Sequence, residues 1–180
     1  RPCRTMVVGP GKKEEFDSNR SRLVAGEASK TAIKKKIGSV AIECFSSDDK
    51  ICRALGEGLV LGSYQFLDYK TNTDKHFELE SAIVLGCDNK NVHTGASIAN
   101  AVCLAKDLGN HPGNYSTPSK LASTAKKVAD EGGMKITVFE RDEFTEMGMG
   151  ALAGVAQGTD EPPKFIVCLL YTSPSPRDSA

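Results

Sequence analysis

The sequence lacks the features that would place the chain on a membrane or on nucleic acid. Its 180 residues carry 23 basic and 23 acidic side chains, so the formal net charge is zero. A neutral chain has no electrostatic attraction to nucleic acid or to an anionic lipid surface. No apolar run approaches the roughly 18 residues that a membrane-spanning helix needs, and the first residues do not resemble a signal peptide. We therefore expect a cytoplasmic protein with no nucleic-acid or membrane partner.

Closely spaced cysteine pairs are also missing. The six cysteines are scattered and form no C-x-x-C pair; they are Cys3, Cys44, Cys52, Cys87, Cys103 and Cys168. Without such spacing, nothing in the sequence favours a zinc site made of cysteine. Cys44, Cys87 and Cys103 lie within apolar patterns that are typical of a protein core. We expect buried, reduced thiols, which are usual in a cytosolic protein.

Alternating apolar segments predict an α/β unit in the first half of the chain. The order strand, helix, strand, helix, strand is typical of a layered domain with a mainly parallel sheet. The expected strands are Thr5–Gly9, Ser39–Phe45 and Phe77–Cys87, and the expected helices run over Phe16–Lys36 and from the capping residues at 46–49 to Phe66. Three glycines interrupt the second helix, and we expect them to allow close packing onto the sheet; they are Gly56, Gly58 and Gly62.

A second, shorter α/β unit follows the polar segment Asp88–Asn91, which we expect to be a linker. Its predicted helices are Val92–Leu108, Pro118–Asp130 and the acidic Glu140–Met147, and its predicted strands are Ile136–Phe139, Ala151–Ala156 and Lys164–Val167. This unit has too few elements to close a core of its own.

The loop between the first two helices of this unit carries the clearest local signals. Gly109 suits the left-handed conformation that ends a helix, and Pro112 and Pro118 prevent the helix from continuing. Thr117 suits the N-cap of the next helix, and Pro118 suits its first position. The sequence therefore predicts a sharp helix–loop–helix junction.

This junction resembles that of a known family. Ala-Lys-Asp-Leu-Gly-Asn-His-Pro-Gly-Asn at 105–114, followed by Thr117-Pro118, is similar to the point where the N-terminal domain of the leucyl (cytosol) aminopeptidase family meets its catalytic domain. Three further stretches agree in the same order, at 6–12, 56–70 and 147–159. The resemblance implies a macro-like N-terminal α/β/α domain with a mainly parallel sheet over 1–88, truncated at its start, and an incomplete α/β catalytic domain over 89–167.

The resemblance also implies an activity, that of a cytosolic metallo-aminopeptidase that removes N-terminal residues, often leucine, from peptides. Two adjacent divalent ions, zinc or manganese, would activate a bridging water and polarise the scissile carbonyl. The whole protein would be a homo-oligomer, a hexamer in this family, acting on peptide substrates.

The active-site segments of that family are absent from this chain. Its metal ligands lie in motifs like Thr-Phe-Asp-Ser-Gly-Gly and Asn-Thr-Asp-Ala-Glu-Gly-Arg, and neither motif occurs here. We therefore assign no catalytic, metal-binding or cofactor-binding residue. We expect no metal ion on this chain and predict that it is inactive by itself.

Other residues with ligand chemistry have simpler structural interpretations. His76, Glu78 and Glu80 alternate, and on one strand face they could hold zinc, but the start of a solvated strand is favoured. The acidic residues near 140 lack the glycine-punctuated loop of a calcium site and indicate a charged helix start; they are Glu140, Asp142, Glu143 and Glu146.

Two residues of the junction could also take part in chemistry. His111 could act as a base, but no Ser or Cys nucleophile has a suggestive spacing to it, so a hydrogen bond that fixes the loop is favoured. Asp107, near a helix C-terminus, is unfavourably placed for the helix dipole. We expect its carboxylate to bond to amides of Gly109–Gly113.

Two alternative functions stay open. The turn Gly9-Pro10-Gly11 follows an apolar run, and such a turn can hold phosphate at a helix N-terminus. The first domain could then bind a nucleotide such as ADP-ribose, as some macro-type domains do, although Glu14 and Glu15 would repel phosphate. The chain could instead be a non-catalytic piece that packs into oligomers. The lysines at 30 and 34–36 indicate a solvated helix end rather than a nucleic-acid patch.

The segment Cys168–Ala180 matches none of these patterns. It is similar to the translation of a transposon-type sequencing adapter, and the family resemblance ends where it begins. We expect this segment to be an adapter artefact and unstructured. A native Ser/Pro-rich tail is the alternative.

Overall fold

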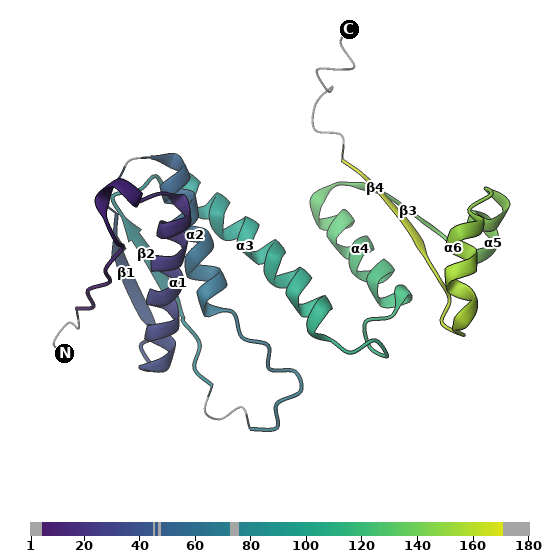
Figure 1. The fold of residues 1–180 in the computed structure, drawn as a ribbon, viewed down its shortest axis with the longest axis horizontal. Helices are drawn as coiled ribbons and strands as arrows, with labels where there is room; N and C mark the ends of the chain where they lie inside the picture. The colour runs from purple at the N-terminus through teal and green to yellow at the C-terminus, as the bar shows by residue number, and fades with distance from the viewer. Residues whose placement is uncertain (1–4, 45, 47, 73–75, 171–180) are drawn as a thin grey trace, which may run out of the picture. The chain divides into compact units, whose positions relative to one another are not determined.

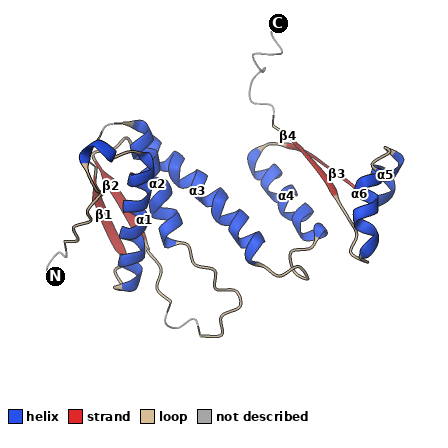
Figure 2. Cartoon of the chain, viewed as in Figure 1, coloured by secondary structure: helices blue, strands red, loops and turns tan. Residues whose placement is uncertain are grey.

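The computed structural model describes residues 5–44, 46, 48–72 and 76–170, so Cys3, Phe45 and most of the predicted tail lie outside it (Figure 1). The chain divides into two compact units, Arg1–Asp107 and Leu108–Ala180. Within the described ranges, each unit holds one pair of strands together with its helices (Figure 2). No helix in this part of the chain is both long enough and apolar enough to cross a bilayer.

The first unit is an α/β unit with a parallel pair of strands, as the sequence predicts. Its elements are a 3-10 turn η1 (Lys13–Glu15), helix α1 (Ser18–Lys34), strand β1 (Ser39–Glu43), helix α2 (Asp49–Ser63), strand β2 (Ser81–Leu85) and helix α3 (Asn89–Asn110). In the register, Ser39 lies opposite Ser81 and Glu43 lies opposite Leu85. The buried core joins the sheet to the helices through Ala25, Leu55, Leu59 and Val84.

Helices α1 and α2 approach each other closely along their small residues. A methyl group on Gly58 of α2 would overlap the carbonyl oxygen of Arg22 on α1. The buried hydroxyl of Ser29 donates to the carbonyl of Leu59 at 2.9 Å. The glycines of α2 therefore serve packing between helices, so our expectation that they pack onto the sheet is wrong.

Helices cover one face of the parallel pair. Val84 is 8% exposed, whereas Ile83 and Leu85, which point to the opposite face, are 57% and 53% exposed. Because successive strand residues alternate between faces, this pattern marks one packed face and one open face. The described residues do not form the second helical layer of an α/β/α arrangement.

The second unit contains helix α4 (Pro118–Gly132), strand β3 (Lys135–Phe139), helices α5 (Arg141–Glu146) and α6 (Gly150–Val155), the turn η2 (Ala156–Gly158) and strand β4 (Phe165–Leu169). Strands β3 and β4 are antiparallel, with Phe139 opposite Phe165. The ring of Phe144 is completely buried. Helix α4 begins as predicted, since Thr117 accepts a bond from the amide of Lys120. It ends two residues beyond the predicted Asp130, where Gly133 adopts the left-handed conformation.

Three predicted strands differ from the observed elements. Thr5–Gly9 is not a strand, since no described strand pairs with it. The strand predicted at Phe77–Cys87 is limited to Ser81–Leu85, the residues that pair with β1. Ala151–Ala156 is mostly helical, because a short apolar run fits either structure and alanine and leucine are strong helix formers.

The predicted linker and the predicted end of ordered structure also differ from the observed elements. Residues 89–91 of the predicted linker form the first turn of α3, and the two compact units divide after Asp107. Strand β4 continues through Leu169, where Cys168 pairs with Ile136 and Leu169 with Lys135. The expectation that structure ends at Val167 is therefore wrong for these two residues, because they continue the apolar run of β4. The origin of the segment as an adapter stays a prediction.

Candidate functional site

The junction after α3 is held by bonds within its own loop. Helix α3 passes through Gly109 and ends at Asn110, so Gly109 lacks the left-handed conformation that we expected. The hydroxyl of Ser116 donates to the carbonyl of Leu108 at 2.9 Å, and thereby satisfies a group that the helix end leaves open. The ring of His111 lies against that of Tyr115, with centroids 4.1 Å apart. The junction is thus a structural turn, and His111 packs within it.

The end of α3 in the first unit carries a polar cluster around Tyr64. The Tyr64 hydroxyl donates to Oδ1 of Asp107 at 2.6 Å, and Nζ of Lys106 lies 3.7 Å from the centre of the tyrosine ring. We expected the carboxylate of Asp107 to bond to loop amides, and the structure pairs it with Tyr64. A cavity of about 400 Å³ nearby is lined by Lys30, Lys34 and Lys106 and by no acidic residue. Because the lining carries three positive charges and no carboxylate, this cavity does not suit a metal cation.

The segment predicted to place His76, Glu78 and Glu80 on one strand face is not a strand. Nδ1 of His76 lies 3.3 Å from Oε1 of Gln65, and the amide of Glu80 donates to the carbonyl of Gly38 at 2.8 Å. Since the alternation of a strand is missing, these side chains do not form the common face that a zinc site would need.

The acidic residues near 140 act at the start of a helix, as the sequence indicates. The carboxylate of Glu143 accepts a bond from the amide of Glu140 at 2.7 Å, and the two residues form a capping box for α5. Lys164 pairs with Glu140 at 2.5 Å. The carboxylates of Glu140 and Glu143 thus already have partners in the fold, which supports the structural interpretation.

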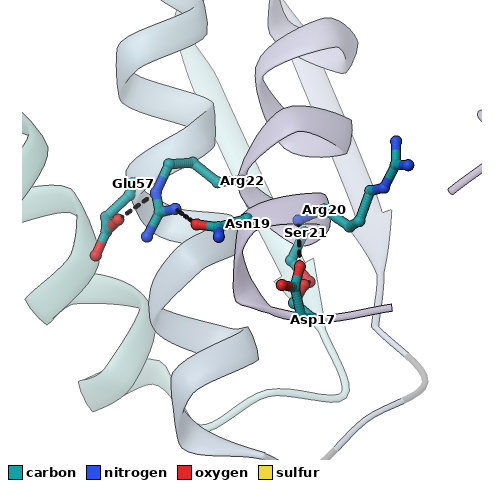
Figure 3. A network of polar contacts seen from close by, with 6 residues as sticks. All are labelled: Asp17, Asn19, Arg20, Ser21, Arg22 and Glu57. Atoms are coloured by element: carbon teal, nitrogen blue, oxygen red, sulfur yellow. Dashed lines mark hydrogen bonds and ion pairs between the residues drawn. The ribbon is translucent and has the colours of Figure 1, made fainter. Parts of the chain in front are cut away.

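The glycine turn at Gly9–Gly11 does not open onto the N-terminus of a long helix. It leads into the short turn η1, and α1 begins only at Ser18. There the carboxylate of Asp17 accepts a bond from the amide of Arg20 at 2.8 Å (Figure 3). An acidic side chain therefore occupies the place that a phosphate would take. The structure thus gives the nucleotide-binding alternative no support.

One arginine near this helix start is also engaged. Nε of Arg22 lies 2.5 Å from the carboxylate of Glu57 on α2, and Nη1 donates to Asn19 at 2.8 Å (Figure 3). The side chain of Glu57 is 13% exposed. This arginine joins α1 to α2 and is not free to bind an anion.

Three cysteines that are distant in sequence meet in the first unit. Cys52 and Cys87 form a disulfide. The sulfur of Cys44 is close by, so that the three sulfur atoms all lie within 4.8 Å of one another. Our expectation of reduced thiols is therefore wrong for Cys52 and Cys87. Sequence spacing offered no signal, because the fold alone brings these residues together. Among the described His, Cys, Asp and Glu residues, this is the one group arranged to hold an ion.

Sulfur donors do not match the family's metal site that the resemblance implies. A two-metal hydrolase of this kind needs carboxylate oxygens and a lysine, whereas the described residues bring together three sulfur atoms. The residues present therefore do not fit a catalytic pair of ions.

Comparison with solved structures finds the same fold in other proteins. The chain matches the bottromycin maturation enzyme BotP in complex with Mn with a TM-score of 0.76 and 26% identity, over 86% of this chain and 33% of that one. A mutant of tomato leucine aminopeptidase has the same fold, with a TM-score of 0.76 and 23% identity, over 86% of this chain and 33% of that one.

The chain belongs to the cytosol aminopeptidase family. The model of the family's N-terminal domain matches residues 3–73, and that of its catalytic domain matches residues 103–180. The second range includes Cys168–Ala180, the segment predicted to be foreign. The two ranges follow in the order of the family's domains and together cover most of the chain.

Curated relatives agree with this assignment. A "Probable cytosol aminopeptidase" of Geotalea uraniireducens is 38% identical over 176 residues, which cover 91% of this chain and 35% of the relative. A protein of the same name from Aquifex aeolicus is 33% identical over 176 residues, covering 96% of this chain and 36% of the relative. The chain thus spans about a third of the length of these relatives.

Proposed function

We propose that this chain is part of a metal-dependent aminopeptidase that hydrolyses N-terminal residues from peptides. The observation that carries the proposal is the match of both family domains, in the family's order, to residues 3–73 and 103–180. The manganese complex of BotP supports metal dependence. The name of the relatives supports a cytoplasmic location. The two-ion mechanism, the choice of zinc or manganese and the hexamer are proposed from the family resemblance.

The chain by itself is proposed to be inactive. Two-metal hydrolysis needs donor groups that hold both ions and leave room for a bridging water. Within the described ranges, the one group arranged to hold an ion consists of sulfur atoms. The metal-binding side chains must therefore come from other residues of the whole protein.

Sequencing of the source transcript past the codon for Val167 tests the assignment to a longer enzyme. We expect the reading frame to continue into a segment like Asn-Thr-Asp-Ala-Glu-Gly-Arg and to omit the codons of Cys168–Ala180. The product of that frame should release p-nitroaniline from Leu-p-nitroanilide, and a chelator should abolish the release. A transcript that encodes Cys168–Ala180 and then stops would contradict the proposal.

The same substrate tests the inactivity of the 180-residue chain. The purified chain, supplied with Mn²⁺ or Zn²⁺, should release p-nitroaniline no faster than buffer with the same ion. Metal-dependent release that co-purifies with the chain would overturn this proposal. It would leave the family assignment intact.

A further inference from the structure

The topology brings Cys44, Cys52 and Cys87 to one edge of the first unit. Cys44 directly follows β1 and Cys87 lies two residues after β2. Because these strands are parallel, their carboxyl ends meet at the same edge, which is where α/β folds commonly bind ligands. The amide of Cys44 donates to the carbonyl of Leu85 at 2.9 Å and continues the pairing to this point. Cys52 comes from the first turns of α2, which begins at Asp49.

The starts of two helices meet at the same edge. Asn91, in the first turn of α3, donates to Oδ1 of Asp49, the first residue of α2, at 2.7 Å. Cys52 lies in the first of these helices and Cys87 lies two residues before the second, so both helix starts adjoin the sulfur atoms. Acidic residues at both helix starts also favour the approach of a cation; they are Asp48, Asp49 and Asp88.

The sulfur atoms are close enough to share one ion. All three lie within 4.8 Å of one another. Zinc binds thiolate sulfur at about 2.3 Å in a tetrahedral arrangement, which places two ligand sulfurs about 3.8 Å apart. Cys52 is 1% exposed, while Cys44 and Cys87 are partly exposed, so an ion can reach the group from solvent.

The disulfide alone does not account for the third cysteine. Cys52 and Cys87 are joined, yet the free thiol of Cys44 is held beside them and donates to the carbonyl of Ser46 at 3.2 Å. A structural disulfide needs two sulfurs, whereas a site for a thiophilic cation uses all three.

We propose that Cys44, Cys52 and Cys87 form, in the reduced chain, a three-thiolate site for a thiophilic divalent cation such as Zn²⁺. A dithiol reductant breaks the Cys52–Cys87 bond, yields two thiols and is itself oxidised to a disulfide. Binding of Zn²⁺ then forms three metal–sulfur bonds and releases three protons, and one coordination position stays open to water. The oxidised form holds the disulfide and no ion. The site is independent of the proposed peptidase function, because its donors are sulfur.

Cobalt titration of the reduced 180-residue chain tests this site. After treatment with a dithiol and its removal under argon, Co²⁺ should bind one ion per chain and give a thiolate-to-cobalt charge-transfer band in the near ultraviolet. Zn²⁺ should abolish the band. The Cys44→Ser variant should lower the affinity roughly tenfold or more, and the matched Cys103→Ser variant should leave it unchanged.

Folding is followed in the same samples by far-ultraviolet circular dichroism. The Cys44→Ser variant keeps the disulfide pair, so its oxidised form should have the helix content of the parent chain. If reduction unfolds the parent, Zn²⁺ should restore its helical signal and fail to restore that of Cys44→Ser. A reduced chain that shows no sulfur-to-cobalt band, or equal affinity in Cys44→Ser, would overturn the proposal and leave only thiol–disulfide exchange.

Discussion

At the residue scale, enclosure decides what an ion pair contributes. Arg22 and Glu57 lie 2.5 Å apart with side chains 34% and 13% exposed, and Asn19 also bonds to the arginine. Lys127 and Glu131 lie 3.8 Å apart on α4 and are 76% and 67% exposed. Water screens the second pair far more than the first, so only the first should add measurably to stability.

The substitution Glu57→Gln tests this difference. It removes the charge, keeps the shape, and leaves Arg22 with a weaker partner, so the free energy of unfolding should fall by about 1 kcal/mol. Urea unfolding followed by circular dichroism measures the change. The control Glu131→Gln should change the free energy by less than about 0.5 kcal/mol. Equal losses in the two variants would contradict this account.

A second residue-scale prediction concerns the reactivity of Cys103. Burial raises the pKa of the Cys103 thiol, Lys106 lowers it and Asp107 raises it, with a net upward shift. Because the thiolate is the reactive form, alkylation by iodoacetamide near pH 8 should be slower at Cys103 than at the exposed Cys168. Mass spectrometry of the peptides measures both rates.

Two variants test the direction in which each neighbouring charge shifts the pKa of Cys103. Asp107→Asn removes a contribution that raises the pKa, so the rise of the alkylation rate at Cys103 should move to lower pH. Lys106→Gln removes a contribution that lowers it, so the rise should move to higher pH. Shifts in the same direction for both variants would show that the local charges do not govern this thiol.

At the element scale, contacts between backbones hold the helices of the first unit together. A methyl group on Gly95 of α3 would overlap the carbonyl oxygen of Arg53 on α2. Gly109, on the same helix, has no such neighbour within 4 Å. Glycine is thus required at one position of α3 and dispensable at another.

The pair Gly95→Ala and Gly109→Ala tests this contrast. Alanine favours a helix by about 1 kcal/mol over glycine, so Gly109→Ala should stabilise the chain by up to that amount. In Gly95→Ala, overpacking should outweigh this gain and lower the free energy of unfolding by about 1–3 kcal/mol. Urea unfolding of both variants gives the comparison. A stabilised Gly95→Ala variant would show that α2 and α3 are not in this close contact.

At the scale of the whole molecule, the open face of the parallel strands has consequences for solubility. Ile83 and Leu85 are 57% and 53% exposed on β2, and Val84 between them is 8% exposed. In the register, Ala41 lies opposite Ile83 on the same face. Exposed apolar patches promote association, which agrees with the alternative that this chain packs into oligomers.

The double substitution Ile83→Thr with Leu85→Thr tests the role of that face. It should reduce binding of the dye ANS and lower light scattering, while the free energy of unfolding changes by less than about 0.5 kcal/mol. The control Val84→Thr places a hydroxyl in the core and should cost about 1–3 kcal/mol. Unchanged scattering in the double variant would exclude this face as the cause of association.

The sequence predicted features that depend on neighbouring residues. The start of α4 at Thr117 and Pro118 and the acidic start of α5 follow from groups within a few residues of one another. The family could also be recognised, because its motifs are local and occur in order. Local hydrogen bonds and steric limits on the backbone are sufficient to specify such features.

Features that join distant segments needed the tertiary structure. Thr5–Gly9 is an apolar run like those of β1 and β4, and the absence of a pairing partner separates it from them. The meeting of Cys44, Cys52 and Cys87 depends on two parallel strands and a helix start, so their spacing in the sequence carries no trace of it. Local composition therefore specified most helices and the family, whereas strand pairing and the sulfur cluster were decided by contacts between segments that only the folded chain brings together.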